Sequence, residues 1–113
     1  MLLSVIVPCY NEEGNIDRFY EETVRALGDL MPRTEIIFVN DGSKDKTYPE
    51  LKKLHKENPT SSIQVLTFSR NFGKEAAIYA GLSNAKGNLV CIIDADLQQR
   101  PEVVLEMLDE IEK

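Results

Sequence analysis

The chain has 113 residues, of which 42% are hydrophobic and 28% are charged, and its net charge at neutral pH is -6. This length and composition are typical of one globular domain with a real core and exclude a disordered chain. The acidic balance disfavours a non-specific nucleic-acid binder, which needs a basic surface. The sequence contains no apolar run long enough to span a membrane and no basic flank of a signal peptide, so we expect the chain as given to be cytoplasmic.

Short apolar segments rich in β-branched residues alternate with longer segments whose apolar residues recur with helical spacing. The apolar segments run almost without polar alternation, which is typical of strands buried on both faces of a sheet. In chain order, the pattern predicts a strand at 2–7, a helix at 16–30, a strand at 35–39, a helix at 47–57, a strand at 63–68, a helix at 74–85, a strand at 88–93 and a helix from Pro101 onward.

Two helix ends carry local signals. Thr47 and Glu50 have the spacing of a capping box at the start of the second helix. The third helix stops before Gly87, a residue type that often ends helices in a left-handed conformation.

Strands that alternate with helices predict an α/β fold with a parallel sheet of about four strands and helices on both faces. The unusual polar residues all follow the predicted strands, in segments 8–13, 40–43, 69–75 and 94–98. In an open parallel sheet these strand ends share one edge, where ligands bind at the point at which strand order reverses. If the first strand is central, with the second and fourth on either side, the binding crevice lies between 8–13 and 94–98.

Asp94 and Asp96 are separated by one alanine and follow the fourth predicted strand. No basic partner for them is obvious from the sequence, so the pair favours a hard divalent cation, Mg²⁺ or Mn²⁺, with Gln98 as a further carbonyl ligand. The same residues also suit a helix entry, because acidic groups favour the positive end of a helix dipole. The motif alone fits both interpretations equally.

Other residues of this edge have both a functional and a local interpretation. Asp41 could accept hydrogen bonds from a base or ribose, but Asn-Asp-Gly-Ser is also ordinary turn chemistry, with Gly42 free to take a positive φ. Tyr10 could pack a base, and Glu12 could accept ribose hydroxyls. Lys74, at the start of a helix, could meet a phosphate together with free backbone N–H groups or could simply be a solvated lysine of the first turn. A cation is mildly unfavourable at that end of a helix, which favours the functional interpretation.

The remaining reactive side chains are predicted to be structural. Cys9 and Cys91 lie in apolar segments without a CxxC pattern, which favours buried free thiols over a disulfide or metal pair. His55 lies among lysines, which predicts a surface position.

Four segments of the chain, in this order and at these spacings, resemble the family 2 glycosyltransferases: VIVPCYNEE, VNDGSKDKT, SRNFGKEAAI and IIDADLQQRPE. Within that family they look most like the enzymes that transfer sugars to polyprenyl phosphates such as bactoprenol or dolichol phosphate. The resemblance covers nearly the whole chain. It departs from the family where DADLQDPPE is common, because this chain has Gln99 and Arg100 there.

The resemblance implies a nucleotide-diphospho-sugar transferase fold of the GT-A type, of which this chain is the Rossmann-like N-terminal, donor-binding half. It implies an inverting, metal-dependent transfer from a UDP- or GDP-sugar to a polyprenyl phosphate, with the whole protein at the cytoplasmic face of a membrane. The residues that match the family's nucleotide site are Pro8, Tyr10, Asn11, Glu12, Asp41, Gly42, Ser43, Lys74, Asp94 and Ala95. Those that match its metal site are Asp94, Asp96 and Gln98, and no catalytic residue falls within residues 1–113.

Three further expectations follow. The isolated chain should bind a uridine or guanosine diphosphate weakly and transfer nothing. It should also self-associate, because a shortened sheet exposes an edge and apolar surface. The alternatives are a non-catalytic nucleotide-binding module and a receiver-like signalling domain, although a receiver would need an acceptor aspartate after its third strand and a lysine after a fifth strand.

Overall fold

A computed structural model describes residues 1–96 together with Glu102, Glu106 and Asp109. Its elements follow the predicted alternation of strands and helices. They are β1 (Leu3–Cys9), α1 (Ile16–Leu27), the 3-10 helix η1 (Gly28–Arg33), β2 (Thr34–Asn40), α2 (Thr47–Glu57), β3 (Ser62–Thr67), α3 (Lys74–Asn84) and β4 (Leu89–Ile92).

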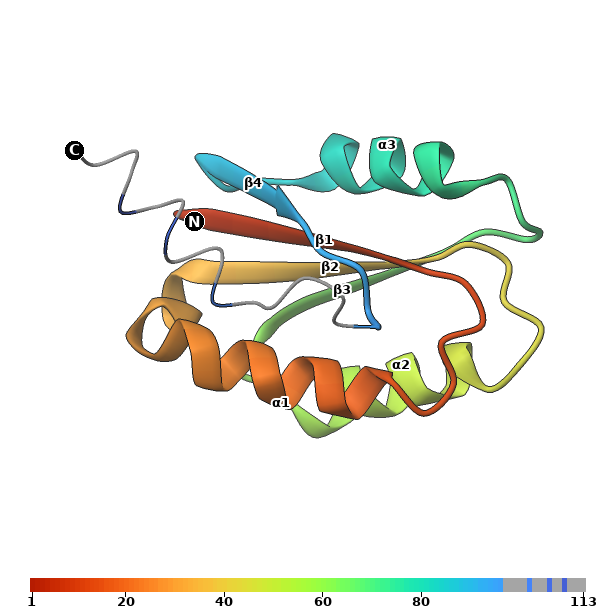
Figure 1. Cartoon of the computed structure of the whole chain (residues 1–113), viewed down its shortest axis with the longest axis horizontal. Coiled ribbons are helices and arrows are strands. Elements are labelled where there is room, and N and C mark those ends of the chain that lie inside the picture. Colours follow the sequence, from red (N-terminus) through yellow and green to blue (C-terminus); the bar gives the residue numbers. More distant parts are fainter. Residues whose placement is uncertain (97–101, 103–105, 107–108, 110–113) are drawn as a thin grey trace.

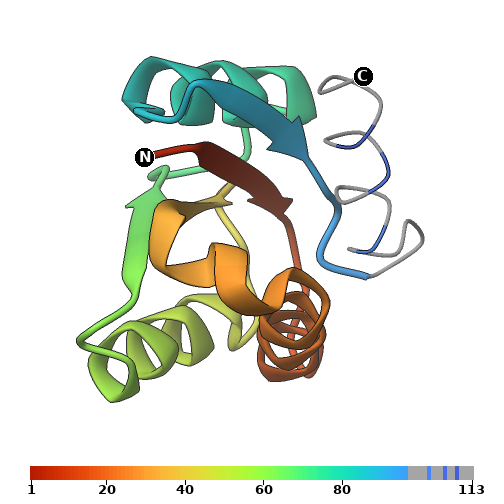
Figure 2. The same ribbon diagram turned by 90° about the vertical axis from the view of Figure 1, so that its left-hand side faces the viewer.

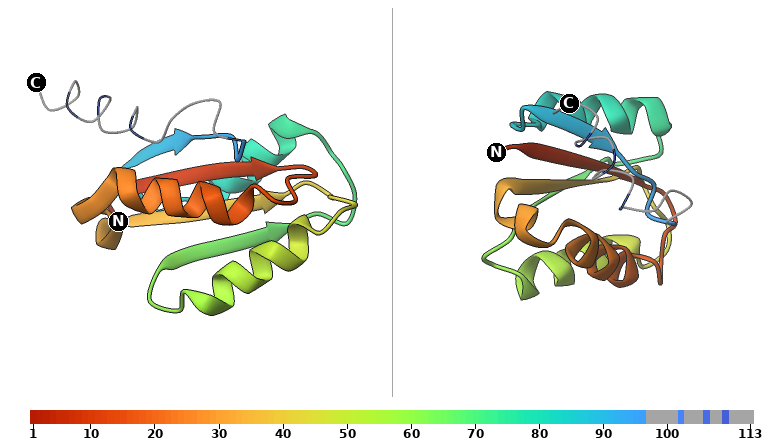
Figure 3. Two further views of the ribbon diagram at one scale, coloured as in Figure 1. Left: turned by 60° about the horizontal axis from the view of Figure 1, so that its bottom comes forward. Right: turned by 60° about the vertical axis from the view of Figure 1, so that its left-hand side comes forward.

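The strands form one parallel sheet in the order β3-β2-β1-β4, so the first strand has the second and fourth on either side, which is the condition for the predicted crevice. Val5 of β1 lies in register with Ile36 of β2 on one side and with Cys91 of β4 on the other. α1 and α2 cover one face of the sheet and α3 covers the other (Figure 1). Figures 2 and 3 show β3 and β4 at opposite edges of this sheet.

The core lies on both faces of the two central strands. On the face covered by α1 and α2, Phe19 and Phe38 pack edge to face with ring centroids 5.9 Å apart. On the other face, Ala77 of α3 packs against β2. Here α3 approaches the sheet closely, because a Cβ on Gly81 would lie only 2.5 Å from a side-chain carbon of Ile6.

The edge strands differ from the prediction of burial on both faces. Residues of β4 alternate between partly buried and exposed, and Val90 and Ile92 expose 40% and 38% of their surface. These side chains are exposed because α3 covers its face of the sheet over β1 and β2 and leaves β4 uncovered on that face. A continuous apolar run therefore identified the strand but not how deeply it is buried.

Three predicted helix ends were wrong in detail. α1 ends at Leu27, where Gly28 adopts a φ of 49° and the chain continues as a 3-10 turn. Gly87 is not left-handed; its lack of a side chain allows a close approach to β1, since a Cβ would lie 2.6 Å from Ser4 N. Thr47 makes no cap, and its hydroxyl instead accepts a hydrogen bond from Glu12 N at 2.8 Å.

The other structural predictions have mixed outcomes. Both cysteines are free, with Cys9 buried and Cys91 only partly buried, and His55 is exposed. The helix predicted from Pro101 onward lies outside the described residues except for Glu102, Glu106 and Asp109, which are helical. Within the described part of the chain, no helix has the length and apolar character needed to cross a membrane.

Candidate functional site

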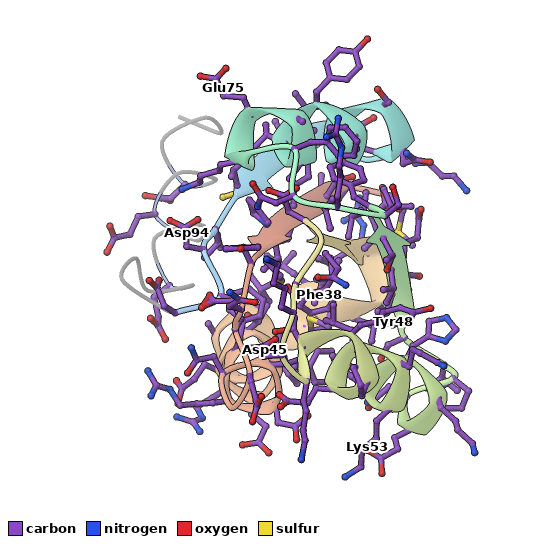
Figure 4. The ribbon with its side chains drawn as sticks, turned by 90° about the vertical axis from the view of Figure 1, so that its right-hand side faces the viewer. Phe38, Asp45, Tyr48, Lys53, Glu75 and Asp94 are labelled. Carbon is purple, nitrogen blue, oxygen red and sulfur yellow. The ribbon has the colours of Figure 1, made fainter. Side chains whose placement is uncertain are left out.

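A cavity of about 480 Å³ opens at the carboxyl ends of the strands. Figure 4 looks onto this edge of the sheet, with Asp94 between α3 above and α1 below. All four polar segments singled out in the sequence contribute to its walls, including Asp41 and Asp94 from opposite sides of β1. The lining residues are Pro8, Cys9, Tyr10, Glu12, Asp41, Asn71, Gly73, Lys74, Asp94 and Asp96.

Asp41 is buried in the wall of the cavity, where it shapes the loop that follows β3. Its carboxylate accepts hydrogen bonds from Phe72 N at 2.8 Å, from Gly73 N at 3.0 Å and from the Asn71 side chain at 3.0 Å. Gly42 beside it has a φ of 66°, and a Cβ there would lie 2.2 Å from the backbone carbon of Arg70. The loops after β2 and β3 therefore meet backbone to backbone, which only glycine permits here.

Lys74, the first residue of α3, reaches across the cavity to Asp94. Its Nζ lies 2.9 Å from Oδ1 and 3.1 Å from Oδ2 of that carboxylate. The view that the two aspartates have no basic partner was therefore wrong. Sequence distance hid the pairing, because the two residues are brought together only when β4 lies beside β1.

The cavity is strongly acidic around Glu12. Burial raises the pKa of the half-buried Glu12 carboxyl, and the negative charges of Asp96, Asp94 and Asp45 raise it further, against a hydrogen bond from Asn15. Burial likewise raises the pKa of the Cys9 thiol, which keeps it protonated and unreactive. Carboxylates that repel one another in this way favour a bound cation.

Two predicted site residues serve the loops that build the cavity, outside its lining. Asn11 N donates to Ser43 Oγ at 3.0 Å, and Lys44 N donates to Asn11 Oδ1 at 2.9 Å. Gly42 and the buried Ala95 also lie outside the lining. Gln98 lies outside the described residues.

Three lining residues are absent from the predicted site residues: Cys9, Asn71 and Gly73. Asn71 lies in the segment 69–75 that the analysis did single out, so its position after a strand was the available signal. Cys9 ends β1, and its apolar neighbours concealed its place at the edge of the cavity.

The donor set suits a hard cation that is shared with a ligand. Among the described residues, no group of three or more His, Cys, Asp or Glu side chains is placed to hold a metal by itself. Asp94 and Asp96 nevertheless supply two carboxylates to one cavity. Mg²⁺ is commonly held by one or two carboxylates with substrate phosphates and water completing its shell, and these residues fit that arrangement.

The sequence profile of glycosyl transferase family 2 matches residues 4–113. The chain belongs to glycosyl transferase family 2. This membership excludes the receiver-like alternative, and the parallel sheet with its helices has the GT-A glycosyltransferase fold.

Several curated members of glycosyl transferase family 2 are similar over nearly the whole chain. An uncharacterised glycosyltransferase of Synechocystis is 46% identical over 107 residues, which are 95% of this chain and 33% of that protein. The bactoprenol glucosyl transferase of Shigella phage SfV is 44% identical over 110 residues, which are 96% of this chain and 35% of that protein. The chain thus spans about a third of the length of these relatives.

Solved structures agree with the family. The mannosyltransferase PcManGT from Pyrobaculum calidifontis, in complex with GDP-Man and Mn²⁺, matches with a TM-score of 0.77 and 26% identity over 83% of this chain and 27% of its own. TarS 1-349 of S. aureus in complex with UDP-GlcNAc matches with a TM-score of 0.76 and 28% identity over 99% of this chain and 31% of its own.

Proposed function

We propose that this chain is the donor-binding part of a glycosyltransferase that transfers a sugar from a UDP- or GDP-sugar to a polyprenyl phosphate, with inversion, at the cytoplasmic face of a membrane. The observation that carries the proposal is the single cavity in which the loops after all four strands meet. The similarity to bactoprenol glucosyl transferases supports the acceptor class. The donors bound by PcManGT and TarS support the donor class without choosing between the two bases.

The cavity offers a distinct role to each side chain in its wall. Tyr10, whose ring is partly exposed, stacks against the base, and Glu12 accepts hydrogen bonds from the ribose. Asp41, with its carboxylate committed to the loop after β3, holds the wall of the nucleoside pocket in shape. Pro8 closes the end of β1 beneath the ligand.

The diphosphate is the leaving group, so negative charge develops on it as the glycosidic bond breaks. Asp94 and Asp96 would hold Mg²⁺ or Mn²⁺, with Gln98 as a further ligand, and the bound cation supplies positive charge to the leaving diphosphate. Lys74 supplies a second positive charge on the same side of the cavity. A polyprenyl phosphate is already anionic near neutral pH, so the acceptor needs less help from a general base than a sugar hydroxyl would.

Calorimetry on the 113-residue chain tests the donor site. UDP- and GDP-sugars are titrated with and without Mn²⁺ into the wild type, Asp96→Asn and the control Asp29→Asn, whose side chain is exposed on η1. We expect weak binding that needs Mn²⁺, loss of binding in Asp96→Asn and no change in the control. Metal-independent binding that Asp96→Asn leaves intact would remove the support for the metal assignment.

A transfer assay separates binding from catalysis. The isolated chain is expected to leave radiolabelled sugar on the nucleotide when it is given a polyprenyl phosphate. Detectable glycosylation of the lipid would show that the catalytic groups lie within residues 1–113.

A further inference from the structure

Among the described residues that line the cavity, Lys74 is the one with a cationic side chain, and four others are acidic. It pairs with both oxygens of Asp94, at 2.9 and 3.1 Å. The other ion pair that joins described residues, Arg25 with Glu22, lies within α1 and is local. The Lys74–Asp94 pair instead connects α3 to the segment that follows β4.

This pair is built to exchange partners. Both side chains are in contact with water, with 59% of Lys74 and 38% of Asp94 exposed. Ion pairs of this kind are screened by water and contribute little to stability, so a stronger ligand for either partner displaces the other at small cost. A divalent cation binds the Asp94 carboxylate more strongly than the Lys74 ammonium does. A phosphate binds the Lys74 ammonium more strongly than the Asp94 carboxylate does.

The position of Lys74 at the start of α3 favours a phosphate as its next partner. It begins α3, and the helix has no side-chain cap at this end, where the helix dipole already carries partial positive charge. A lysine here is held in place by Asp94. When a cation binds Asp94, the Lys74 ammonium and the N-terminal end of α3 both present positive charge to the cavity. This arrangement binds phosphate.

From this geometry we propose that Lys74 occupies the place of the cation at Asp94 in the ligand-free site and passes to a phosphate of the donor when the cation arrives. The proposal rests on the proposed function, because it assumes a nucleoside diphosphate in the cavity. It assigns Lys74 the role of a phosphate-binding residue that couples the two ligands. Without nucleotide, binding of the cation to Asp94 requires displacement of Lys74. Without the cation, the nucleotide meets a Lys74 that is already paired with Asp94. When both are present, the cation releases Lys74 for the phosphate, and the phosphate releases Asp94 for the cation.

The coupling is measurable without catalysis. Electron paramagnetic resonance reports free Mn²⁺ and therefore gives the affinity of the chain for Mn²⁺ alone. The affinity in the presence of UDP or GDP follows once the Mn²⁺ that the nucleotide binds without the chain has been measured and subtracted. The ratio of the two affinities is the coupling factor, and linkage requires the same factor for the effect of Mn²⁺ on nucleotide affinity. The variants are Lys74→Gln, Lys74→Arg and the control Lys53→Gln, which removes one charge from α2, far from Asp94 in Figure 4.

Lys74→Gln is expected to bind Mn²⁺ alone about two- to fivefold more tightly than the wild type, the range that corresponds to removing one exposed ion-pair partner. Its coupling factor is expected to fall, because nucleotide no longer gains a freed lysine. Lys74→Arg keeps the charge and should retain the low affinity for Mn²⁺ alone, and Lys53→Gln should match the wild type.

An equal or lower affinity of Lys74→Gln for Mn²⁺ alone, or a coupling factor equal to that of the wild type, overturns the exchange. These outcomes differ from failure of the proposed function, in which the wild type binds neither UDP nor GDP in the presence of Mn²⁺. A circular dichroism spectrum unchanged from the wild type confirms that each variant is folded, as expected for exposed side chains.

Discussion

Asp41 lies in the wall of the cavity, yet both of its carboxylate oxygens accept hydrogen bonds from the loop after β3. Two backbone N–H groups and one side-chain amide converge on this one buried group. Backbone donors that face a charged acceptor form short, strong hydrogen bonds, and they lose water on burial. The carboxylate therefore fixes the loop from Asn71 to Gly73, which begins α3 and positions Lys74.

We predict that Asp41→Asn lowers the free energy of unfolding by about 1–3 kcal/mol, because the amide turns donors toward the N–H groups of Phe72 and Gly73. Urea unfolding followed by circular dichroism measures this, since the chain has no tryptophan. The exposed Asp29→Asn removes the same charge and should leave the midpoint unchanged. Equal midpoints for the two variants would show that the hydrogen bonds to Asp41 carry no stability.

At the scale of elements, the turn after β1 is bonded to the loop after β2. The backbone N–H groups of the first turn donate to side chains of the second: Glu13 N donates to Asp45 at 3.1 Å, and Gly14 N donates to Glu50 at 3.0 Å. The second loop donates in return, from Lys46 N to Glu13 Oε1 at 3.0 Å. These reciprocal bonds hold the starts of α1 and α2 together and keep one side of the cavity in place.

Asn11 offers a matched test of this contact. Its φ of 53° is left-handed, and its Oδ1 accepts from Lys44 N. Asn11→Gly loses that hydrogen bond but tolerates the backbone, whereas Asn11→Ala loses the bond and also strains the backbone. We expect Asn11→Ala to lower the free energy of unfolding by about 1–3 kcal/mol, and Asn11→Gly by about 1 kcal/mol less. Urea unfolding of both variants checks the order, and a less stable glycine variant would contradict it.

The contact between the turn after β1 and the start of α2 shows a limit of local sequence patterns. Periodicity located the four strands and the three α-helices of residues 1–96, because each buries apolar side chains, but it did not predict η1, which has no buried residue. The spacing of Thr47 and Glu50 indicated a capping box, but both side chains accept hydrogen bonds from the turn after β1 instead. Local spacing cannot reveal a partner that is more than thirty residues away in the chain.

The candidate site shows the same division. The rule that parallel strands end at one edge predicted that Asp41, Lys74 and Asp94 lie close together. The rule could not show that Asp41 would serve the loop after β3 or that Lys74 would neutralise Asp94, because both depend on side-chain geometry. The sequence therefore predicted which segments meet at the cavity better than it predicted which contacts each side chain makes there.

At the scale of the whole molecule, the sheet has two edges among the described residues, β3 and β4, each paired on one side. The two differ in what they present. β3 carries partly buried apolar residues beside α2, whereas β4 presents exposed Val90 and Ile92 on the face that α3 leaves uncovered. The unpaired N–H and C=O groups of an edge strand are a template for pairing with another chain, and exposed apolar side chains on that strand favour the association.

We predict that the 113-residue chain self-associates through β4 as its concentration rises. The double variant Val90→Thr, Ile92→Thr should shift the equilibrium toward monomer, because threonine keeps the preference for strand while removing apolar surface. Val24→Thr is the control, since Val24 has a similar exposure of 37% on α1, away from the sheet edge. Sedimentation equilibrium measures the masses. A wild type that stays monomeric at millimolar concentration, or a control that dissociates as much as the double variant, would refute association through this edge.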